Sequence, residues 1–312
     1  LGATKPELQL IMANEKPVAS EVVTLGGDTY NKEVYSNKEL YFNNGGQLVM
    51  INITKPVVEG ALEGARAAYA KAYEVDLKQS KLKDINAGLE NIAKKYLDEG
   101  MNKYTLGDYA GASVLFEKAA DASATAPLSK TDTTALYNAG FTAWMVKDYP
   151  RAKDLFEKCL AAEYYYEGGE VFAKLADIYT NLGEKEASRD ILEQGFQKFP
   201  QSQSILIGLI NYYMESGKNA DRLFVLINEA KKNEPDNASL YYVEGNVYNE
   251  LRQADPAKAD EYLAKAVEAY DACAGINAAY EFGYIGKGIM YYNIAIELQD
   301  KAANDLDDAK WE

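Results

Sequence analysis

The chain has 312 residues, 47% of them hydrophobic and 26% charged, with a formal net charge of −15 from 33 basic and 48 acidic residues. This composition is globular, and the length exceeds one ordinary compact core, so it favours two domains or a repeat array. An excess of acidic residues repels phosphate groups, which argues against nucleic acid and anionic lipid as partners.

Two absences restrict the chemistry of the chain. It contains no histidine, which excludes Ser-His-Asp and Cys-His catalysis and histidine-ligated zinc. Its two cysteines, Cys159 and Cys273, are too few for a disulfide framework or a four-cysteine metal site. We therefore expect no catalytic residues, no metal and no cofactor. No apolar run approaches the roughly 20 residues of a membrane span, and the missing initial methionine suggests a removed leader.

Residues 1–89 have an irregular pattern. Gly27 with Tyr30 suggests the first helix of a repeat, and Ala65, Tyr69 and Ala72 suggest a second helix. Between them we expect an insertion at about residues 35–56, where Asn-Asn-Gly-Gly is a turn signal and a β-branched, apolar run follows. A short hairpin, an ordered loop and a helix broken at Pro56 are the alternatives that the sequence leaves open.

From about residue 90 the sequence repeats. Residues 106–119 read LGDYAGASVLFEKA and residues 147–159 read KDYPRAKDLFEKC, so an Asp-Tyr turn twice precedes a helix. Each of these helices carries a small residue, a bulky residue four later and a small residue three after that. The two sets are Ala112, Phe116 and Ala119, then Ala152, Phe156 and Cys159.

A further helix precedes each of these, marked by a landmark residue that is usually small. The landmarks are separated by 40, 36, 34, 35 and 43 residues, close to the ~34-residue period of a helix-turn-helix repeat. Antiparallel helices approach closely only where side chains are small, so each landmark should face the bulky residue of its partner helix. The landmarks are Gly100, Gly140, Ala176, Ile210, Gly245 and Gly288.

The pattern resembles the tetratricopeptide repeat (TPR) family, most visibly at Tyr241, Gly245 and Tyr248 and again at Tyr284 and Gly288. The resemblance covers about residues 90–295. It implies an all-α, right-handed superhelical solenoid of antiparallel helix pairs, regular over residues 90–312. The similarity to exported bacterial members of the family implies a periplasmic or cell-envelope location, with the cytoplasm as the alternative.

In this family the concave groove is lined by first-helix positions three before, and one and four after, the landmark. These positions predict an aromatic front and an amide-rich middle, suited to binding a peptide. Packing on the next helix is the alternative for the aromatic residues, whereas amides rarely occupy a dry core. The expected groove residues are Tyr104, Tyr137, Phe141, Trp144, Asn211, Tyr242, Asn246 and Asn249.

The lysine positions of the family's carboxylate clamp hold other residues here, so a C-terminal carboxylate ligand is not expected. The predicted function is a non-enzymatic scaffold that binds a protein or peptide in its groove. The alternative is a glycan or small ligand on the rings of Tyr137, Phe141 and Trp144. Both ends look cut within repeats, so self-association through uncapped ends is a further expectation.

Overall fold

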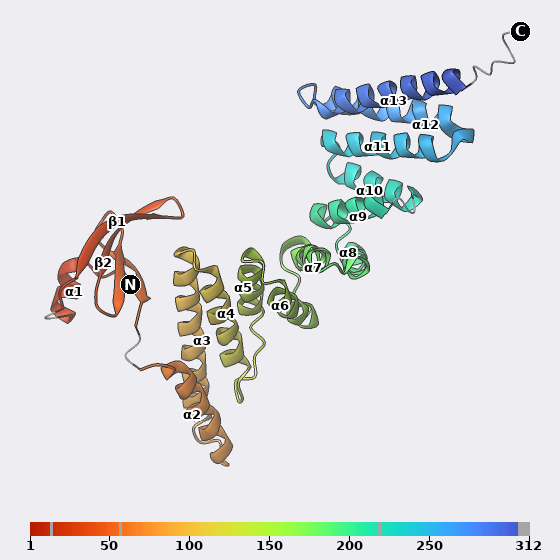
Figure 1. The fold of residues 1–312 in the computed structure, drawn as a ribbon. Helices are drawn as coiled ribbons and strands as arrows, with labels where there is room; N and C mark the ends of the chain where they lie inside the picture. Colours follow the sequence, from red (N-terminus) through yellow and green to blue (C-terminus); the bar gives the residue numbers. More distant parts are fainter. Residues whose placement is uncertain (13–14, 56–57, 217–219, 305–312) are drawn as a thin grey trace, which may run out of the picture. The chain divides into compact units, whose positions relative to one another are not determined.

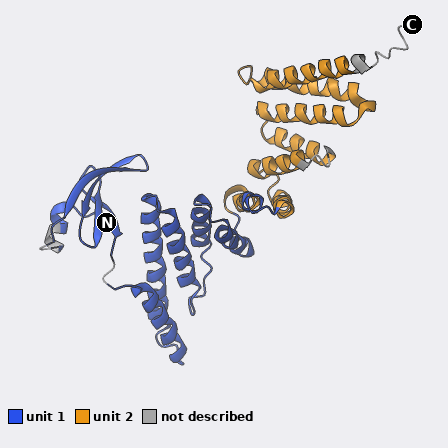
Figure 2. Ribbon diagram, viewed as in Figure 1, with its two compact units in different colours: residues 1–165, 177–184 blue, residues 166–176, 185–312 orange. Residues whose placement is uncertain are grey.

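The computed structural model describes residues 1–12, 15–55, 58–216 and 220–304 (Figure 1). They form two compact units (Figure 2). The first contains residues 1–165 and 177–184, and the second contains residues 166–176 and 185–312.

The first unit begins with a short helix and an antiparallel sheet. The four strands follow one another in the order β1-β2-β3-β4, so each pairs with its neighbour in the sequence (Figure 1). The sheet packs its buried side chains Tyr35, Leu40, Phe42 and Leu48 against Leu8 and Met12. The elements are α1 (Lys5–Ile11), β1 (Ala19–Leu25), β2 (Asp28–Val34), β3 (Lys38–Phe42) and β4 (Leu48–Ile53).

This sheet corrects part of the sequence interpretation. Gly26 and Gly27 have φ values of +60° and +91° and form the turn between β1 and β2, while Tyr30 lies within β2. The first helix expected there is wrong, because the alternating segments on either side of the glycines pair as strands. The hairpin among the alternatives for residues 43–53 is confirmed as β3 and β4. The broken helix is wrong for these residues, and Pro56 itself lies outside the described residues.

From Ala61 onward the structure is helical, which confirms the predicted helical solenoid for this part of the chain (Figure 1). The helix expected around Ala65, Tyr69 and Ala72 is α2. Two 3₁₀ turns, Glu167–Gly169 and Pro256–Lys258, interrupt the series. The helices are α2 (Ala61–Val75), α3 (Leu82–Thr105), α4 (Tyr109–Ala124), α5 (Thr133–Met145), α6 (Tyr149–Ala161), α7 (Glu170–Asn181), α8 (Lys185–Lys198), α9 (Gln203–Ser216), α10 (Ala220–Asn233), α11 (Ala238–Ala254), α12 (Ala259–Ile276) and α13 (Phe282–Asn304).

The Asp-Tyr turns are helix N-caps. The Asp108 carboxylate accepts a hydrogen bond of 2.9 Å from the Gly111 backbone N–H, and Asp148 accepts one of 3.4 Å from Arg151. Such caps satisfy backbone donors that the first helical turn leaves unpaired. The residues just before these caps, Gly107 and Lys147, have positive φ and reverse the chain between paired helices.

Two landmark glycines, Gly100 and Gly140, meet the bulky residue of the partner helix as the repeat predicts. A Cβ placed on Gly100 would lie 2.7 Å from the Phe116 ring, and one on Gly140 would lie 3.2 Å from Phe156. Both rings are almost completely buried. The absent side chain therefore makes room for an aromatic ring of the partner helix, which fixes the spacing within each pair.

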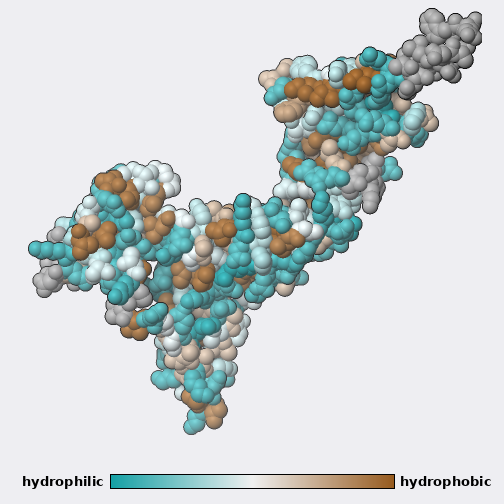
Figure 3. Space-filling view, in the orientation of Figure 1, coloured by the Kyte–Doolittle hydropathy of each residue, from teal (hydrophilic) through white to brown (hydrophobic). Residues whose placement is uncertain are grey.

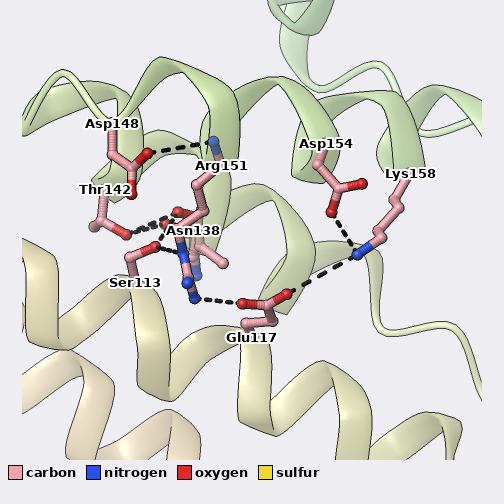
Figure 4. Close-up of polar contacts among 9 residues, drawn as sticks. Ser113, Glu117, Asn138, Thr142, Asp148, Arg151, Asp154 and Lys158 are labelled. Atoms are coloured by element: carbon pink, nitrogen blue, oxygen red, sulfur yellow. Dashed lines mark hydrogen bonds and ion pairs between the residues drawn. The ribbon is translucent and has the colours of Figure 1, made fainter.

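A polar network in the first unit joins α4, α5 and α6 (Figure 4). The Arg151 guanidinium pairs with Glu117 and donates a 3.0 Å hydrogen bond to Ser113 Oγ. Ser113 in turn donates to the Ala139 carbonyl at 2.8 Å. Lys158 adds a 3.9 Å contact with Glu117. Because Ser113 is buried and Arg151 and Glu117 are partly buried, the network holds α5 between its two neighbours.

Replacing a landmark glycine should destabilise the first unit. In Gly100→Leu the new side chain would collide with the Phe116 ring, and we expect a loss of about 1–3 kcal/mol in the free energy of unfolding, measured by chemical denaturation. Gly64→Leu on α2 is the matched control, because a Cβ at Gly64 meets nothing within 4 Å. Equal losses in the two variants would contradict this packing argument.

Removing the central cation of the polar network should also destabilise the fold. We expect Arg151→Ala to lower the free energy of unfolding by about 1–3 kcal/mol, because it leaves Glu117 without its arginine partner. Arg189→Ala is the control, since Arg189 pairs with the exposed carboxylate of the adjacent Asp190. An exposed pair contributes about 0–1 kcal/mol. Thermal and denaturant unfolding of both variants would distinguish a structural network from surface pairs.

The buried thiol at a small-residue position should make stability depend on alkaline pH. Burial raises the pKa of Cys159 to about 12, compared with about 8.5 in an unfolded chain. The folded state therefore favours the neutral thiol, and this contribution is complete below pH 8.5 and is lost as the pH rises toward 12. Between pH 8 and 10, Cys159→Ala should lose less of its unfolding free energy than the wild type. Parallel pH profiles would contradict this assignment.

Candidate functional site

The aromatic front predicted for the groove is a row of rings on α5 in the first unit. Tyr137, Phe141 and Trp144 are spaced by four and three residues, which places them on one helix face. The Tyr137 and Phe141 rings stack with centroids 6.1 Å apart, and the Phe141 and Trp144 rings stack at 5.9 Å. The structure therefore brings these three rings together as a cluster on α5.

The three rings differ in exposure. Tyr137 is buried and meets Phe156 and Tyr164 edge-on at 5.7 and 6.1 Å. It is a core residue, which favours the packing alternative at this position. Phe141 and Trp144 are half-buried, so they can present ring surface to a ligand. The accessible part of the cluster is the pair Phe141 and Trp144.

A polar edge adjoins this pair. The Trp144 indole N–H donates a hydrogen bond of 2.5 Å to the carboxylate of Asp177, which is exposed on α7. Asn181, one turn further along α7, donates to the Asp177 carbonyl oxygen at 2.8 Å. A carboxylate and an amide thus lie next to the stacked rings. We call the surface formed by Phe141, Trp144, Asp177 and Asn181 the aromatic–acid patch.

Tyr104 occupies a different environment. It lies near the end of α3, half-buried, with its ring 5.3 Å from that of Tyr109 at the start of α4. Met101, one turn earlier, is 50% exposed. Tyr104 therefore packs on the second helix of its own pair, as the alternative interpretation of the aromatic positions allows.

The predicted amides lie in the second unit, and most of them support the helix packing. Asn246 Oδ1 accepts a 2.8 Å hydrogen bond from the Tyr270 hydroxyl, and Asn249 Oδ1 accepts one of 3.3 Å from Arg252 Nε. Tyr242 is half-buried, and its ring lies 6.2 Å from Tyr270 and 5.6 Å from Phe282. Asn246 and Tyr242 thus make contacts from α11 to α12 and α13, whereas Asn249 bonds within α11.

Asn211 differs from the other amides, because it is exposed on α9. Beside it in the sequence, the rings of Tyr212 and Tyr213 meet edge-on at 5.4 Å. Of the amides predicted for the groove, Asn211 is thus the one that the structure leaves open to a ligand in the second unit.

Sequence reasoning missed a cavity of about 500 Å³ in the first unit, lined by the end of β4 and by α2, α3 and α4. The Tyr96 hydroxyl borders it, buried and without a hydrogen-bond partner among the described residues. Burial raises the pKa of Glu99 at the same cavity, while the hydrogen bond from Lys118 lowers the pKa of Glu63. Ile53 at the end of β4 contributes to this cavity, and the sequence pattern left that strand as one of several alternatives.

The described residues hold no group of three or more Cys, Asp or Glu side chains arranged to bind a metal ion. No helix in the described part of the chain combines the length and the apolar character needed to cross a bilayer.

Comparison with known proteins gives a likeness at the level of solved structures. No protein-family model matches the sequence, and no curated protein matches it. The protein YrrB, described as a TPR protein with an unusual peptide-binding site, is 20% identical, with 72% of this chain and all of that chain covered and a TM-score of 0.46. For MamA the values are 21% identity, 61% and 95% coverage and a TM-score of 0.47. A TPR repeats protein from Bacteroides fragilis is 17% identical, with 64% and 98% covered and a TM-score of 0.41.

At these identities and TM-scores the likeness carries no conclusion about function. The fold assignment rests on the chain itself: capped antiparallel helices in which Gly100, Gly140 and Gly245 receive an aromatic ring of the partner helix. The resemblance seen in the sequence is therefore confirmed at the level of the fold, and each unit contains helix pairs of the TPR type.

Proposed function

We propose that the protein is a non-enzymatic scaffold that binds a peptide or a segment of a partner protein on the aromatic–acid patch of its first unit. The observation that carries the proposal is the stacked, half-buried pair Phe141 and Trp144 beside the exposed Asp177 carboxylate. Rigid aromatic rings next to directed polar groups are typical of positions that anchor a ligand.

The chemistry of the patch suits an extended peptide. Its rings can cover one apolar side chain, and the Asp177 carboxylate and the Asn181 side-chain oxygen can accept hydrogen bonds from backbone N–H groups. The polar network around Arg151 holds α5, which carries the rings, so the patch is preorganised. With a net charge of −15, the chain favours a basic segment over an acidic one.

A glycan is the second candidate, and the same observation favours it. A sugar ring can stack on Phe141 or Trp144 while its hydroxyl groups bond to Asp177 and Asn181. A basic peptide is attracted by the acidic surface, whereas a neutral glycan gains little from it. The affinity for the peptide should therefore fall with added salt, and the affinity for the glycan should change little.

In the second unit, taken by itself, Asn211 is an exposed polar side chain on α9. We expect Asn246 and Asn249 to support the fold of that unit, because their side-chain oxygens already accept internal hydrogen bonds. Substituting Asn246 should therefore lower stability, whereas substituting Asn211 should leave it unchanged.

Selection of 12-residue peptides from a random displayed library against the immobilised full chain tests the proposal. For a selected peptide, we expect Trp144→Ala to weaken binding at least tenfold in fluorescence anisotropy, because truncating an anchor ring removes both packing and the link to Asp177. Val114→Ala is the control, since Val114 is an exposed apolar residue on a second helix. Its affinity should equal that of the wild type.

Other outcomes would redirect or reject the proposal. Selected peptides whose binding is unchanged in both Trp144→Ala and Phe141→Ala would contradict a site at this patch. Salt-insensitive binding to a glycan array that disappears in Trp144→Ala, together with no peptide enrichment, would replace the peptide with the glycan.

A further inference from the structure

The cavity bordered by the end of β4 and by α2, α3 and α4 has no part in the proposed function. Its volume of about 500 Å³ lies within the range of small-molecule sites. In Figure 3 the hydrophobic residues of the first unit lie in small groups among hydrophilic ones, so an apolar ligand gains most where a cavity encloses it. Aliphatic side chains line this one, namely Ile53, Val58, Leu62 and Leu115.

One polar group of the cavity lacks a partner. Tyr96 on α3 is 3% exposed, and its hydroxyl makes no hydrogen bond within the described residues. Burial and the nearby Glu63 carboxylate raise the pKa of Tyr96, so the hydroxyl keeps its proton at neutral pH. A buried hydroxyl without a partner costs free energy. A ligand atom that forms a hydrogen bond with it would remove this cost.

The two carboxylates of the cavity differ in their partners. Glu63 on α2 forms an ion pair with Lys118 on α4. Glu99 on α3 is half-buried and forms no ion pair among the described residues. Burial raises the pKa of Glu99, because the positive charges of Lys95 and Lys118 offset the cost of burying its charge only in part. Glu99 is therefore a negative charge that lacks a directly bound cation.

These charges favour a cationic ligand over an anionic one. An anion in the cavity would be repelled by Glu63 and Glu99, and Lys118 is already neutralised by its ion pair. Lys55, the other cation of the lining, is exposed and keeps its contact with water. Tyr96 and Glu99 are three residues apart on α3, so their side chains are neighbours on one helix face. An ammonium group carries enough N–H donors to bond to both.

We infer that this cavity binds a small organic amine, with its protonated nitrogen at Glu99 and Tyr96 and its hydrocarbon body against the aliphatic lining. The ammonium group donates hydrogen bonds to the Glu99 carboxylate and to the Tyr96 hydroxyl oxygen. Lys118 keeps its ion pair with Glu63 and lies 5.7 Å from the centre of the Tyr96 ring, so the ring is held before the ligand arrives. This site is separate from the aromatic–acid patch and does not depend on it.

Three probes of equal length and different charge test the inference. Octylamine is protonated at neutral pH, octanol is neutral and octanoate is negative. In isothermal titration calorimetry with the full chain, below the micelle concentrations of the probes, we expect saturable binding of octylamine at one site. Octanol should bind at least tenfold more weakly, because it cannot form the charged hydrogen bonds, and octanoate should not bind.

Protein variants locate the amine. Glu99→Gln keeps the shape of the side chain and removes its charge, so octylamine should bind at least tenfold more weakly. Tyr96→Phe should weaken binding by about threefold to tenfold, because one hydrogen bond is lost. Glu250→Gln is the matched control. The pKa of Glu250, on α11 of the second unit, is also raised by burial, and the variant makes the same change in net charge. Its affinity should equal that of the wild type.

Thermal unfolding separates a binding role from a structural one. In the free protein Glu99→Gln removes a half-buried charge and Tyr96→Phe removes an unpaired hydroxyl. Both variants should therefore unfold at or above the melting temperature of the wild type while they lose affinity for octylamine.

Four results would overturn the inference. The first is no binding of octylamine, and the second is binding of octanoate at least as tight as that of octylamine. The third is equal affinity of octylamine for the wild type and for Glu99→Gln. The fourth is a lower melting temperature in both Glu99→Gln and Tyr96→Phe, because the two groups would then serve the fold and not a ligand.

Discussion

The arrangement of the helices depends on one contact: an aromatic ring placed where the neighbouring helix has no side chain. A Cβ would lie 2.7 Å from such a ring at Gly100 and 2.6 Å at Gly245, so a larger residue would force the ring to shift, and at Gly140 the distance of 3.2 Å makes a tight contact. The contact therefore fixes how near the two helices lie and which face each turns outward. The candidate binding residues occupy positions defined relative to it, so their placement is a consequence of core packing.

The helical part of this structure could be predicted from local sequence signals. The Asp-Tyr turns cap the helices, and the small–bulky–small spacing predicts the ring contacts at Phe116 and Phe156. The sheet could not be found in the same way. Gly27 followed by Tyr30 fits the landmark of a repeat helix and also fits a hairpin turn. The strand β1 is mostly exposed, so it shows no buried stripe in the sequence. The pairing of β1 and β2 with the later hairpin therefore has no local signal comparable to the helix caps.

The candidate site shows a similar division. The positions of Tyr137, Phe141 and Trp144 on one helix face follow from spacing, but their roles follow from burial. Tyr137 is enclosed by Phe156 and Tyr164, which come from later segments of the chain. Asn246 binds Tyr270, 24 residues away. A rule that amides avoid dry cores cannot distinguish an amide that faces a ligand from one that satisfies a buried hydroxyl.

The gap-and-ring contact also shows what an uncovered helix face looks like in this chain. Gly100, Gly140 and Gly245 each receive a ring of the partner helix. At Gly288 a Cβ would meet nothing within 4 Å among the described residues, and several isoleucine and tyrosine side chains of α13 are exposed. Their exposure costs free energy in water, so the physical demand that brings Tyr270 onto Gly245 acts on this face of α13 as well.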